Sequence, residues 1–281
     1  TGTVESKAYD NSWYSGYSGN GKGYGRIYGE DGNDTIDASK TSAAYELNGG
    51  NGDDIIYGAQ EYTQNIYGGT GDDTITSSKG QLVSNRWSHI DGGEGNDTIT
   101  SSTTLGAINT TIYGGYGDDI ITGGDGTDTV TAGSGDDTIS GGNDADTIIF
   151  GTNLTTSDTI DGGAGTDELR FTDSGSATSD LDGVTNVETV TLGDASTSVT
   201  TVDALVGSGQ TLTVSAAALT GTNALTWDGS AETNGSFNIT GSSQADTITG
   251  GAGADTISSG NDADTITVSY THLTLPTSDL V

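Results

Sequence analysis

A nine-residue phrase that recurs along the chain constrains the fold more than any other feature of the sequence. Residues 123–149 read GGDGTDTVT, AGSGDDTIS and GGNDADTII without a spacer. All units carry aspartate at the sixth position and an aliphatic residue at the eighth, and most carry threonine at the seventh. A period this regular predicts a repeat architecture. The twelve units begin at residues 29, 49, 68, 92, 114, 123, 132, 141, 162, 241, 250 and 259.

Each position of the phrase suits one step of a turn that leads into a strand. Glycine at positions one, two and four permits a positive φ, so the turn can aim several carbonyl groups inward. Aspartate closes the turn with a carboxylate, and the β-branched residues that follow favour extended backbone. Because side chains alternate along a strand, we expect position eight to point into the core and positions seven and nine to point outward.

The turn offers oxygen ligands alone, since the phrase contains no histidine and the chain has no cysteine. Carbonyl and carboxylate oxygens in a flexible turn favour calcium, which takes about six to eight oxygen ligands, over magnesium, which demands a stricter octahedron. One turn cannot supply that many ligands, so two stacked turns are expected to share each ion. The carboxylate ligands predicted from the phrase are Asp34, Asp54, Asp73, Asp97, Asp119, Asp128, Asp137, Asp146, Asp167, Asp246, Asp255 and Asp264.

The pattern G-G-x-G-x-D with an aliphatic residue at position eight resembles the hemolysin-type calcium-binding repeat of RTX proteins. The resemblance implies an all-β fold, a parallel β-roll or β-helix solenoid with two strands per coil and calcium between consecutive turns on each edge. A coil would span 18 residues, so the turns at 114 and 132 would share an ion on one edge, and those at 123 and 141 on the other. The glycines of these turns that complete the predicted metal site are Gly115, Gly117, Gly124, Gly126, Gly133, Gly135 and Gly142.

The N-terminal units are spaced 20, 19, 24 and 22 residues apart, and each follows a short strand-like segment such as RIYG or NIYGG. We therefore expect one full coil per unit, with a calcium turn on one edge and an ordinary loop on the other. Turns 29, 49, 68, 92, 114 and 132 would form a long stack, and turns 123, 141 and 162 a shorter one. Turn 241 would stack on turn 259, while turn 250 faces the other edge. Counting neighbouring turns gives about eight calcium ions.

The distribution of the phrase divides the chain into five segments. Residues 1–28 are expected to be a Gly/Tyr-rich irregular or capping coil, residues 29–174 an RTX β-roll, residues 175–240 metal-free β-helix coils, and residues 241–267 a second RTX block. A separate small β-domain is the alternative for residues 175–240, which contain several short aliphatic-rich strands. Residues 268–281 contain the one proline, Pro276, and resemble a translated sequencing-adapter read-through fused to the open reading frame.

Composition limits the functions that such a roll can serve. The chain has 40 Asp and Glu against 7 Lys and Arg, a formal net charge of −33. This balance argues against nucleic acid as a partner, because phosphates attract basic residues. No apolar run is long enough for a membrane-spanning helix. Stacked carboxylates repel one another, so the metal-free chain is expected to be open and to fold when calcium binds.

The resemblance implies a calcium-binding structural segment of a secreted or cell-surface bacterial protein, of the S-layer or large-adhesin type, and no enzymatic activity. Calcium ions are the expected partners, and self-assembly or contact with a cell surface stays open. The alternative is an accessory module of an RTX enzyme (a protease, lipase or epimerase) whose catalytic domain is missing here. An ice-binding β-helix is a third hypothesis, raised by Thr-x-Thr at residues 129–131, 189–191 and 211–213, which do not align at one coil period.

Overall fold

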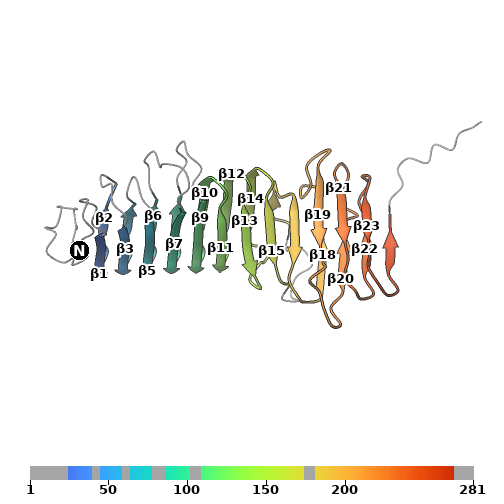
Figure 1. Ribbon diagram of the computed structural model, residues 1–281, viewed down its shortest axis with the longest axis horizontal. Helices are drawn as coiled ribbons and strands as arrows, with labels where there is room; N and C mark the ends of the chain where they lie inside the picture. The colour runs from blue at the N-terminus through green and yellow to red at the C-terminus, as the bar shows by residue number, and fades with distance from the viewer. Residues whose placement is uncertain are drawn as a thin grey trace, which may run out of the picture.

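The structure is a computed structural model that describes residues 25–39, 45–58, 64–77, 87–101, 109–173 and 181–268. These residues form an elongated stack of coils whose strands run across the long axis (Figure 1). Every described regular element is a β-strand, and the strand pairs are parallel, which confirms the expected all-β parallel solenoid. None of the described residues forms a helix that could cross a bilayer. Most of the expected N-terminal coil, residues 1–24, and of the expected adapter-derived tail, residues 269–281, lies outside the described residues.

The strands form three sheets, and the chain alternates between sheet A and either sheet B or sheet C, so each coil contributes two strands. Sheet A contains β1 (Gly25–Asp31), β3 (Tyr45–Asn51), β5 (Gln64–Thr70), β7 (Trp87–Glu94), β9 (Asn109–Tyr116), β11 (Thr129–Ser134), β13 (Thr147–Gly151), β15 (Glu168–Phe171), β17 (Thr189–Leu192), β19 (Thr211–Ser215), β21 (Ser236–Thr240) and β23 (Thr256–Ser258). Sheet B contains β2 (Thr35–Asp37), β4 (Ile55–Tyr57), β6 (Thr74–Thr76), β8 (Thr98–Thr100), β10 (Ile120–Asp125), β12 (Thr138–Asn143), β14 (Thr159–Ala164) and β16 (Val184–Thr185). Sheet C contains β18 (Thr197–Thr200), β20 (Leu225–Asp228), β22 (Thr247–Thr249) and β24 (Thr265–Thr267).

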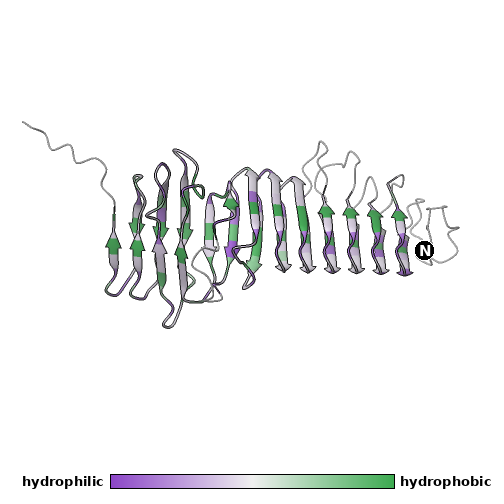
Figure 2. Cartoon of the chain, turned by 180° about the vertical axis from the view of Figure 1, so that it is seen from behind, coloured by the Kyte–Doolittle hydropathy of each residue, from purple (hydrophilic) through white to green (hydrophobic). Residues whose placement is uncertain are grey.

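The core is a column of aliphatic side chains from each face of the coil. In sheet B, Ile56 pairs with Ile75, and Ile75 pairs with Ile99 on the next strand. The eighth-position residues from Ile36 to Ile248 are at most 1% exposed, which confirms that this position points inward. Figure 2 shows hydrophobic bands on successive strands along the stack. Burying one such side chain contributes about 1.5–3 kcal/mol, so the regular phrase stabilises the stack coil by coil.

The stack continues through the region that lacks the phrase. Sheet A passes from β15 through β17, β19 and β21 to β23 without a break. The core is wider here: Trp227 and Phe237 are fully buried and meet edge to face, with ring centroids 5.6 Å apart. Larger side chains therefore fill the interior where the coils carry longer connections.

Candidate metal site

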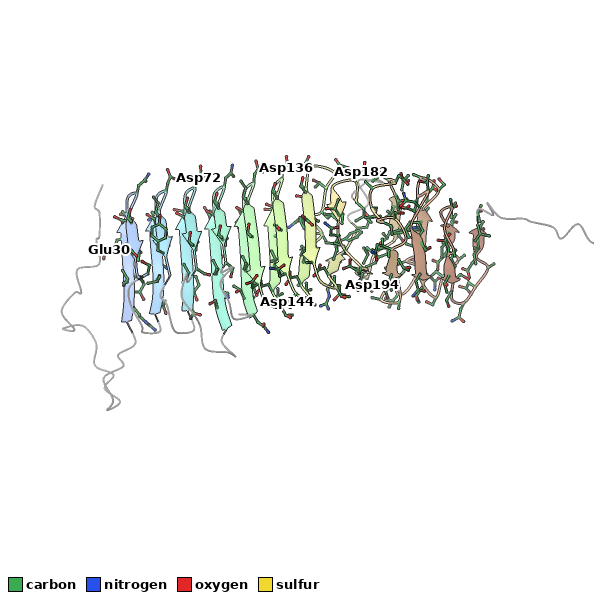
Figure 3. All side chains as sticks on the ribbon, turned by 90° about the horizontal axis from the view of Figure 1, so that it is seen from above. Glu30, Asp72, Asp136, Asp144, Asp182 and Asp194 are labelled. Carbon is green, nitrogen blue, oxygen red and sulfur yellow. The ribbon has the colours of Figure 1, made fainter. Side chains whose placement is uncertain are left out.

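The nonapeptide turns lie on both edges of the stack. Turns 29, 49, 68, 92, 114, 132, 241 and 259 lie on the first edge, where the chain passes from sheet A to sheet B or C. Turns 123, 141, 162 and 250 lie on the second edge, where the chain returns to sheet A. Figure 3 shows Asp72 and Asp136, from turns 68 and 132, on one edge and Asp144, from turn 141, on the opposite edge. The 18-residue coil predicts this alternation.

Positions two and four of the turn require glycine for conformational reasons. In turn 49, Gly50 and Gly52 have φ of 115° and 117°, a region that side chains disfavour. Where the chain departs from glycine at these positions, Glu30 and Asp144 hold φ of 73°, and Asp262 holds φ of 67°. Aspartate tolerates this region better than most residues, which suits Asp144 and Asp262 to position four.

Position one requires glycine for a different reason. The position-one glycines have no positive φ, which corrects the expectation that this position also serves backbone conformation. A methyl group at Gly49 would overlap Oδ2 of Asp54 and would lie 2.7 Å from the carbonyl oxygen of Gly68, in the next coil. The α-carbon of position one therefore faces a small space into which a carboxylate and a main-chain carbonyl both point.

This convergence recurs along the stack. In each case the turn's own aspartate Oδ2 and the position-one carbonyl oxygen of the next coil meet at the same glycine. The eight glycines are Gly29, Gly49, Gly68, Gly92, Gly114, Gly123, Gly141 and Gly241.

The two departures from glycine at position one are informative. Ala132 and Ser259 are the last position-one residues on the first edge before the phrase stops or the described coils end. After turn 132, the next coil carries no nonapeptide turn on this edge. Ala132 therefore has a side chain where no position-one carbonyl has to be accommodated.

The sixth-position aspartates form hydrogen-bonded ladders along each edge. The N–H of Asp54 donates to Oδ1 of Asp73 at 2.7 Å, and the N–H of Asp73 donates to Oδ1 of Asp97 at 2.8 Å. The first-edge ladder runs through Asp34, Asp54, Asp73, Asp97, Asp119 and Asp137. The second-edge ladder runs through Asp128, Asp146 and Asp167. Each ladder aspartate after Asp34 thus uses one oxygen to bind the preceding coil.

The other carboxylate oxygen has no protein partner. These aspartates are at most 5% exposed, and their Oδ2 atoms are buried without a hydrogen bond. A buried, unpaired carboxylate oxygen is unfavourable unless a cation or proton satisfies it. The nine atoms are Oδ2 of Asp34, Asp54, Asp73, Asp97, Asp119, Asp128, Asp137, Asp146 and Asp167. Carboxylate and carbonyl oxygens without nitrogen or sulfur are the donor set that suits calcium.

Burial raises the pKa of eight of these carboxyl groups, those of Asp54, Asp73, Asp97, Asp119, Asp128, Asp137, Asp146 and Asp167. Desolvation is the largest cause, the N–H from the preceding coil opposes it, and neighbouring carboxylates add to it. Burial raises the pKa to about 8 for Asp128, to about 7 for Asp73, Asp97, Asp119 and Asp146, and to about 6 for Asp137 and Asp167. The metal-free gap therefore favours a proton, as expected of a site that lacks its cation.

The predicted glycine ligands stack in register across the coils. The carbonyl oxygens of Gly115 and Gly117 lie against the α-carbons of Gly133 and Gly135, one coil later. The carbonyl of Gly124 faces Gly142 in the same way on the second edge. Gly126 has φ of 112° in its turn. Their role as calcium ligands stays a prediction. In the described part of the chain, three or more carboxylate or imidazole groups do not gather into one metal cage.

The three C-terminal aspartates differ from the others. Asp246 is buried, but Oδ2 accepts the N–H of Ser242 and Oδ1 accepts its hydroxyl, both at 2.7 Å. Ser242 stands at position two, where most turns have glycine, so this turn partly satisfies its own carboxylate. Asp255 and Asp264 are half-buried. Asp264 still accepts the N–H of Asp246 at 2.9 Å, which continues the ladder on the first edge.

Two acidic residues that the phrase does not contain end the ladders. Asp158 is buried and accepts the N–H of Asp137 at 2.7 Å, while its other oxygen accepts the N–H of Thr155. Glu188 accepts the N–H of Asp167 at 2.8 Å. Each begins an acidic–Thr–aliphatic triplet, as do most sixth positions of the phrase, and that triplet is the signal that could have identified them.

The two residues of each adjacent acidic pair lie in different environments. In the pair Asp72–Asp73, Asp73 is buried in the ladder, whereas Asp72 is exposed and accepts the N–H of Asn96 from the next coil at 2.8 Å. The same outer ladder contains Asn33, Asp53, Asp72, Asn96, Asp118 and Asp136. One carboxylate of each pair faces the gap between turns, and the other faces solvent.

His89 and the Thr-x-Thr pairs are outward-facing strand residues and do not form a binding site. His89 lies in β7 on the outer face of sheet A, where its ring packs between Tyr67 and Tyr113 at centroid distances of 5.6 and 5.3 Å. Thr129 and Thr131 share outward columns with Thr189 and Thr191. Of the two intervening coils, the first places Thr147 and Ile149 in these columns and the second places Glu168 and Arg170 there. The threonine pairs thus do not form a continuous array.

Replacing a position-one glycine inside a ladder is expected to remove one ion. A methyl group in Gly92→Ala would overlap Oδ2 of Asp97 and lie 2.6 Å from the carbonyl oxygen of Gly114. Equilibrium dialysis should then give one calcium fewer per chain, with a stability loss of about 1–3 kcal/mol from overpacking. The matched control is Ala132→Gly, which should leave the count unchanged. A full count of ions in Gly92→Ala would contradict the assignment of this gap.

The repeats match a known protein family. The chain matches the family described as the RTX calcium-binding nonapeptide repeat, and the matches include the sixth-position aspartate of all twelve units and more than half of the chain. The matched residues are 23–40, 46–62, 59–81, 88–102, 106–139, 122–152, 155–171 and 238–266. No curated protein matches the chain closely enough to count as a relative.

Proposed function

Because the chain belongs to the family of RTX calcium-binding nonapeptide repeats, we propose that it is the calcium-dependent structural segment of a secreted or cell-surface bacterial protein. As an RTX β-roll it is a calcium-binding structural module. The ions bind between successive turns, and the chain folds when they bind. The observation that carries this proposal is the repeated meeting of an unpaired aspartate Oδ2 with a main-chain carbonyl from the next coil.

We place the ions in the gaps between successive turns of one edge. In the gap between turns 68 and 92, Asp73 contributes Oδ2 and Gly92 contributes its carbonyl oxygen. The carboxylate of Asp97 borders the same gap from the next coil, because its Oδ1 already reaches the N–H of Asp73. Bound calcium neutralises these carboxylates and takes the place of their lost water. Seven glycines face an unpaired Oδ2 in this way, and Gly241 faces the Oδ2 of Asp246 with the same carbonyl geometry, so about eight ions per chain is the expected number.

The charge of the ladder is the reason that folding should depend on calcium. Strands in neighbouring coils lie about 4.8 Å apart. Two carboxylates at that distance repel by about 1 kcal/mol in water and by about 3–4 kcal/mol near a protein surface. The described chain has two ion pairs, Arg26 with Glu46 and Arg170 with Glu168, and neither lies in a ladder. Cations from solution must therefore supply the compensating charge.

Calcium concentration then sets where the chain folds. Extracellular calcium modules bind with dissociation constants of about 10⁻⁴–10⁻³ M. Sites of that strength stay empty in a cytoplasm that keeps calcium low, and they fill outside the cell. A chain of this kind would be exported unfolded and would become a rigid stack at the cell surface or in the medium.

Counting the bound ions tests the placement. Equilibrium dialysis of the chelator-stripped chain against calcium at about 10 mM should give about eight ions per chain. Asp97→Asn keeps the acceptor for the N–H of Asp73 but removes a ladder charge, so it should bind at least one ion fewer. The matched control is Asp72→Asn, whose carboxylate lies on the exposed outer ladder and should leave the count unchanged. Binding of one or two ions by the wild-type chain would refute the proposed placement.

A further inference from the structure

Glu232 is a buried carboxylate outside the nonapeptide phrase. Its side chain is fully buried in the connection between β20 and β21 on the second edge. Oε1 accepts the N–H groups of Asn234 and Gly235 at 2.9 and 2.7 Å. Oε2 is buried and has no partner. Apart from the ladder aspartates, Glu232 is the one described residue whose carboxylate oxygen is left in this state.

The connection that carries Glu232 takes the place of a calcium turn. The N–H of Phe237 donates to Oδ1 of Asp255 at 2.8 Å, which is the bond that joins one ladder aspartate to the next elsewhere. Residue 237 thus occupies the position of a ladder aspartate, yet it is phenylalanine and points into the core. The coil below turn 250 therefore has no ladder carboxylate at residue 237 to face Asp255.

Glu232 brings a carboxylate to the same gap from another position. The N–H of Ala252 donates to the carbonyl oxygen of Glu232 at 2.9 Å. A methyl group at Gly251 would lie 3.0 Å from Cβ and 3.2 Å from Cγ of Glu232. The side chain of Glu232 thus lies directly beneath turn 250. From the upper side, the carboxylate of Asp255 borders the gap through Oδ1, which accepts the N–H of Phe237 from the coil below at 2.8 Å.

Turn 250 differs from the other turns of the same sequence. It reads Gly-Gly-Ala-Gly-Ala-Asp, but Gly251 and Gly253 do not have the positive φ that positions two and four have in turns 49 to 132. The coil on which this turn rests presents Glu232 beneath Gly251.

We propose that the gap between residues 229–235 and turn 250 binds a further calcium ion, with Glu232 in place of the missing ladder aspartate and Asp255 as the facing carboxylate. The inference rests on the proposed function, since it extends calcium binding to a gap bordered on one side by a connection without the phrase. Residues 229–237 lie outside the segments that match the family. The donors are oxygens alone, as calcium prefers, and the ion pairs of the described chain lie at other residues.

The test uses the full chain and counts bound calcium by equilibrium dialysis. Glu232→Gln keeps the acceptor for Asn234 and Gly235 but removes the charge, and it should bind one ion fewer than the wild-type chain. Asp255→Asn should also lose one ion, because no other nonapeptide turn lies beside turn 250 on its edge within the described coils. The double variant should lose one ion in total, since both carboxylates serve the same gap. Asp194→Asn is the control for a change of one charge: its exposed carboxylate accepts bonds from Thr220 and Asn223.

The outcomes separate this site from the proposed function as a whole. If the wild-type chain binds about eight or nine ions and both single variants bind the same number, Glu232 is a structural acceptor and the further site does not exist. If the wild-type chain binds no calcium, the proposed function itself fails. Should Glu232→Gln not reach the wild-type circular dichroism spectrum in saturating calcium, Asp255→Asn decides alone, because Asp255 lies on a half-buried turn.

Discussion

In EGTA at about pH 7.5, the chain is expected to lose most of the β-sheet signal that it shows in calcium at about 10 mM. Each site with a dissociation constant of about 10⁻⁴–10⁻³ M stabilises the fold by about 1.4–2.7 kcal/mol at that concentration. Over about eight sites this amounts to roughly 10–20 kcal/mol, as much as the whole stability of an ordinary domain. Removing calcium should therefore unfold the ladder coils rather than loosen them.

Far-UV circular dichroism during a calcium titration measures this change, and hydrogen exchange locates it. Residues 25–173, which carry the nine unpaired Oδ2 atoms, should lose protection in EGTA. Residues 184–240 should keep more of it, because Trp227 and Phe237 fill a wider core there and the exposed Asp194 and Asp203 accept hydrogen bonds. Magnesium at the same concentration is the control and should restore little, since it demands a strict octahedron. Identical spectra in EGTA and in calcium would contradict the proposal.

Without calcium, lowering the pH from about 8 to about 5 is expected to restore β-sheet. Burial raises the pKa of Asp128 to about 8 and that of Asp73, Asp97 and Asp119 to about 7 in the folded chain. An unfolded aspartate has a pKa of about 3.9, so between these values the folded state binds more protons. The stabilisation that these protonated carboxyl groups give the folded state is therefore fully present below about pH 4 and is lost as the pH rises through 6 to 8. Circular dichroism of chelator-stripped protein across this range measures the effect.

The same protons should compete with calcium. Since a bound ion requires ionised carboxylates, the calcium midpoint should rise as the pH falls from about 8 to about 6. The double variant Asp97→Asn, Asp119→Asn is the control, because it should change stability and calcium binding in opposite directions. Its neutral amides should make the metal-free chain more stable at about pH 8, while the chain binds fewer ions. Loss of β-sheet on acidification of the calcium-free wild-type chain would show that the ladder carboxylates are not buried as described.

Much of the fold follows from the period of the phrase. The 18-residue offset predicts that Asp119 stacks on Asp137 and Asp128 on Asp146, and the structure has both pairs. The inward position of the eighth residue follows from alternation along a strand, and the buried isoleucines confirm it. These features were predictable because each coil repeats the local sequence of the one before. The role of the aspartates as calcium ligands stays a prediction.

The remaining features depend on contacts between coils. Glycine at position one is required by the carbonyl of a residue about 20 positions later, so local backbone rules gave the wrong reason for it. Asp158 ends a ladder without any glycine turn of its own, and Glu232 is buried beneath a turn that begins 18 residues later. Neither environment is visible within nine residues of sequence, because the stack creates it.

The connections of the N-terminal coils differ in length between the two edges. The first five connections from sheet A to the facing sheet each contain three residues, whereas the first four returning connections contain six to ten. Differences in length among these coils are thus confined to the second edge, opposite the first-edge ladder. The stack therefore has one edge of constant connection length, where a single added residue would break the ladder of aspartates, and one edge of variable connection length. Foreign peptides grafted at the edge of variable connection length would be displayed at intervals of about 4.8 Å, one for each coil.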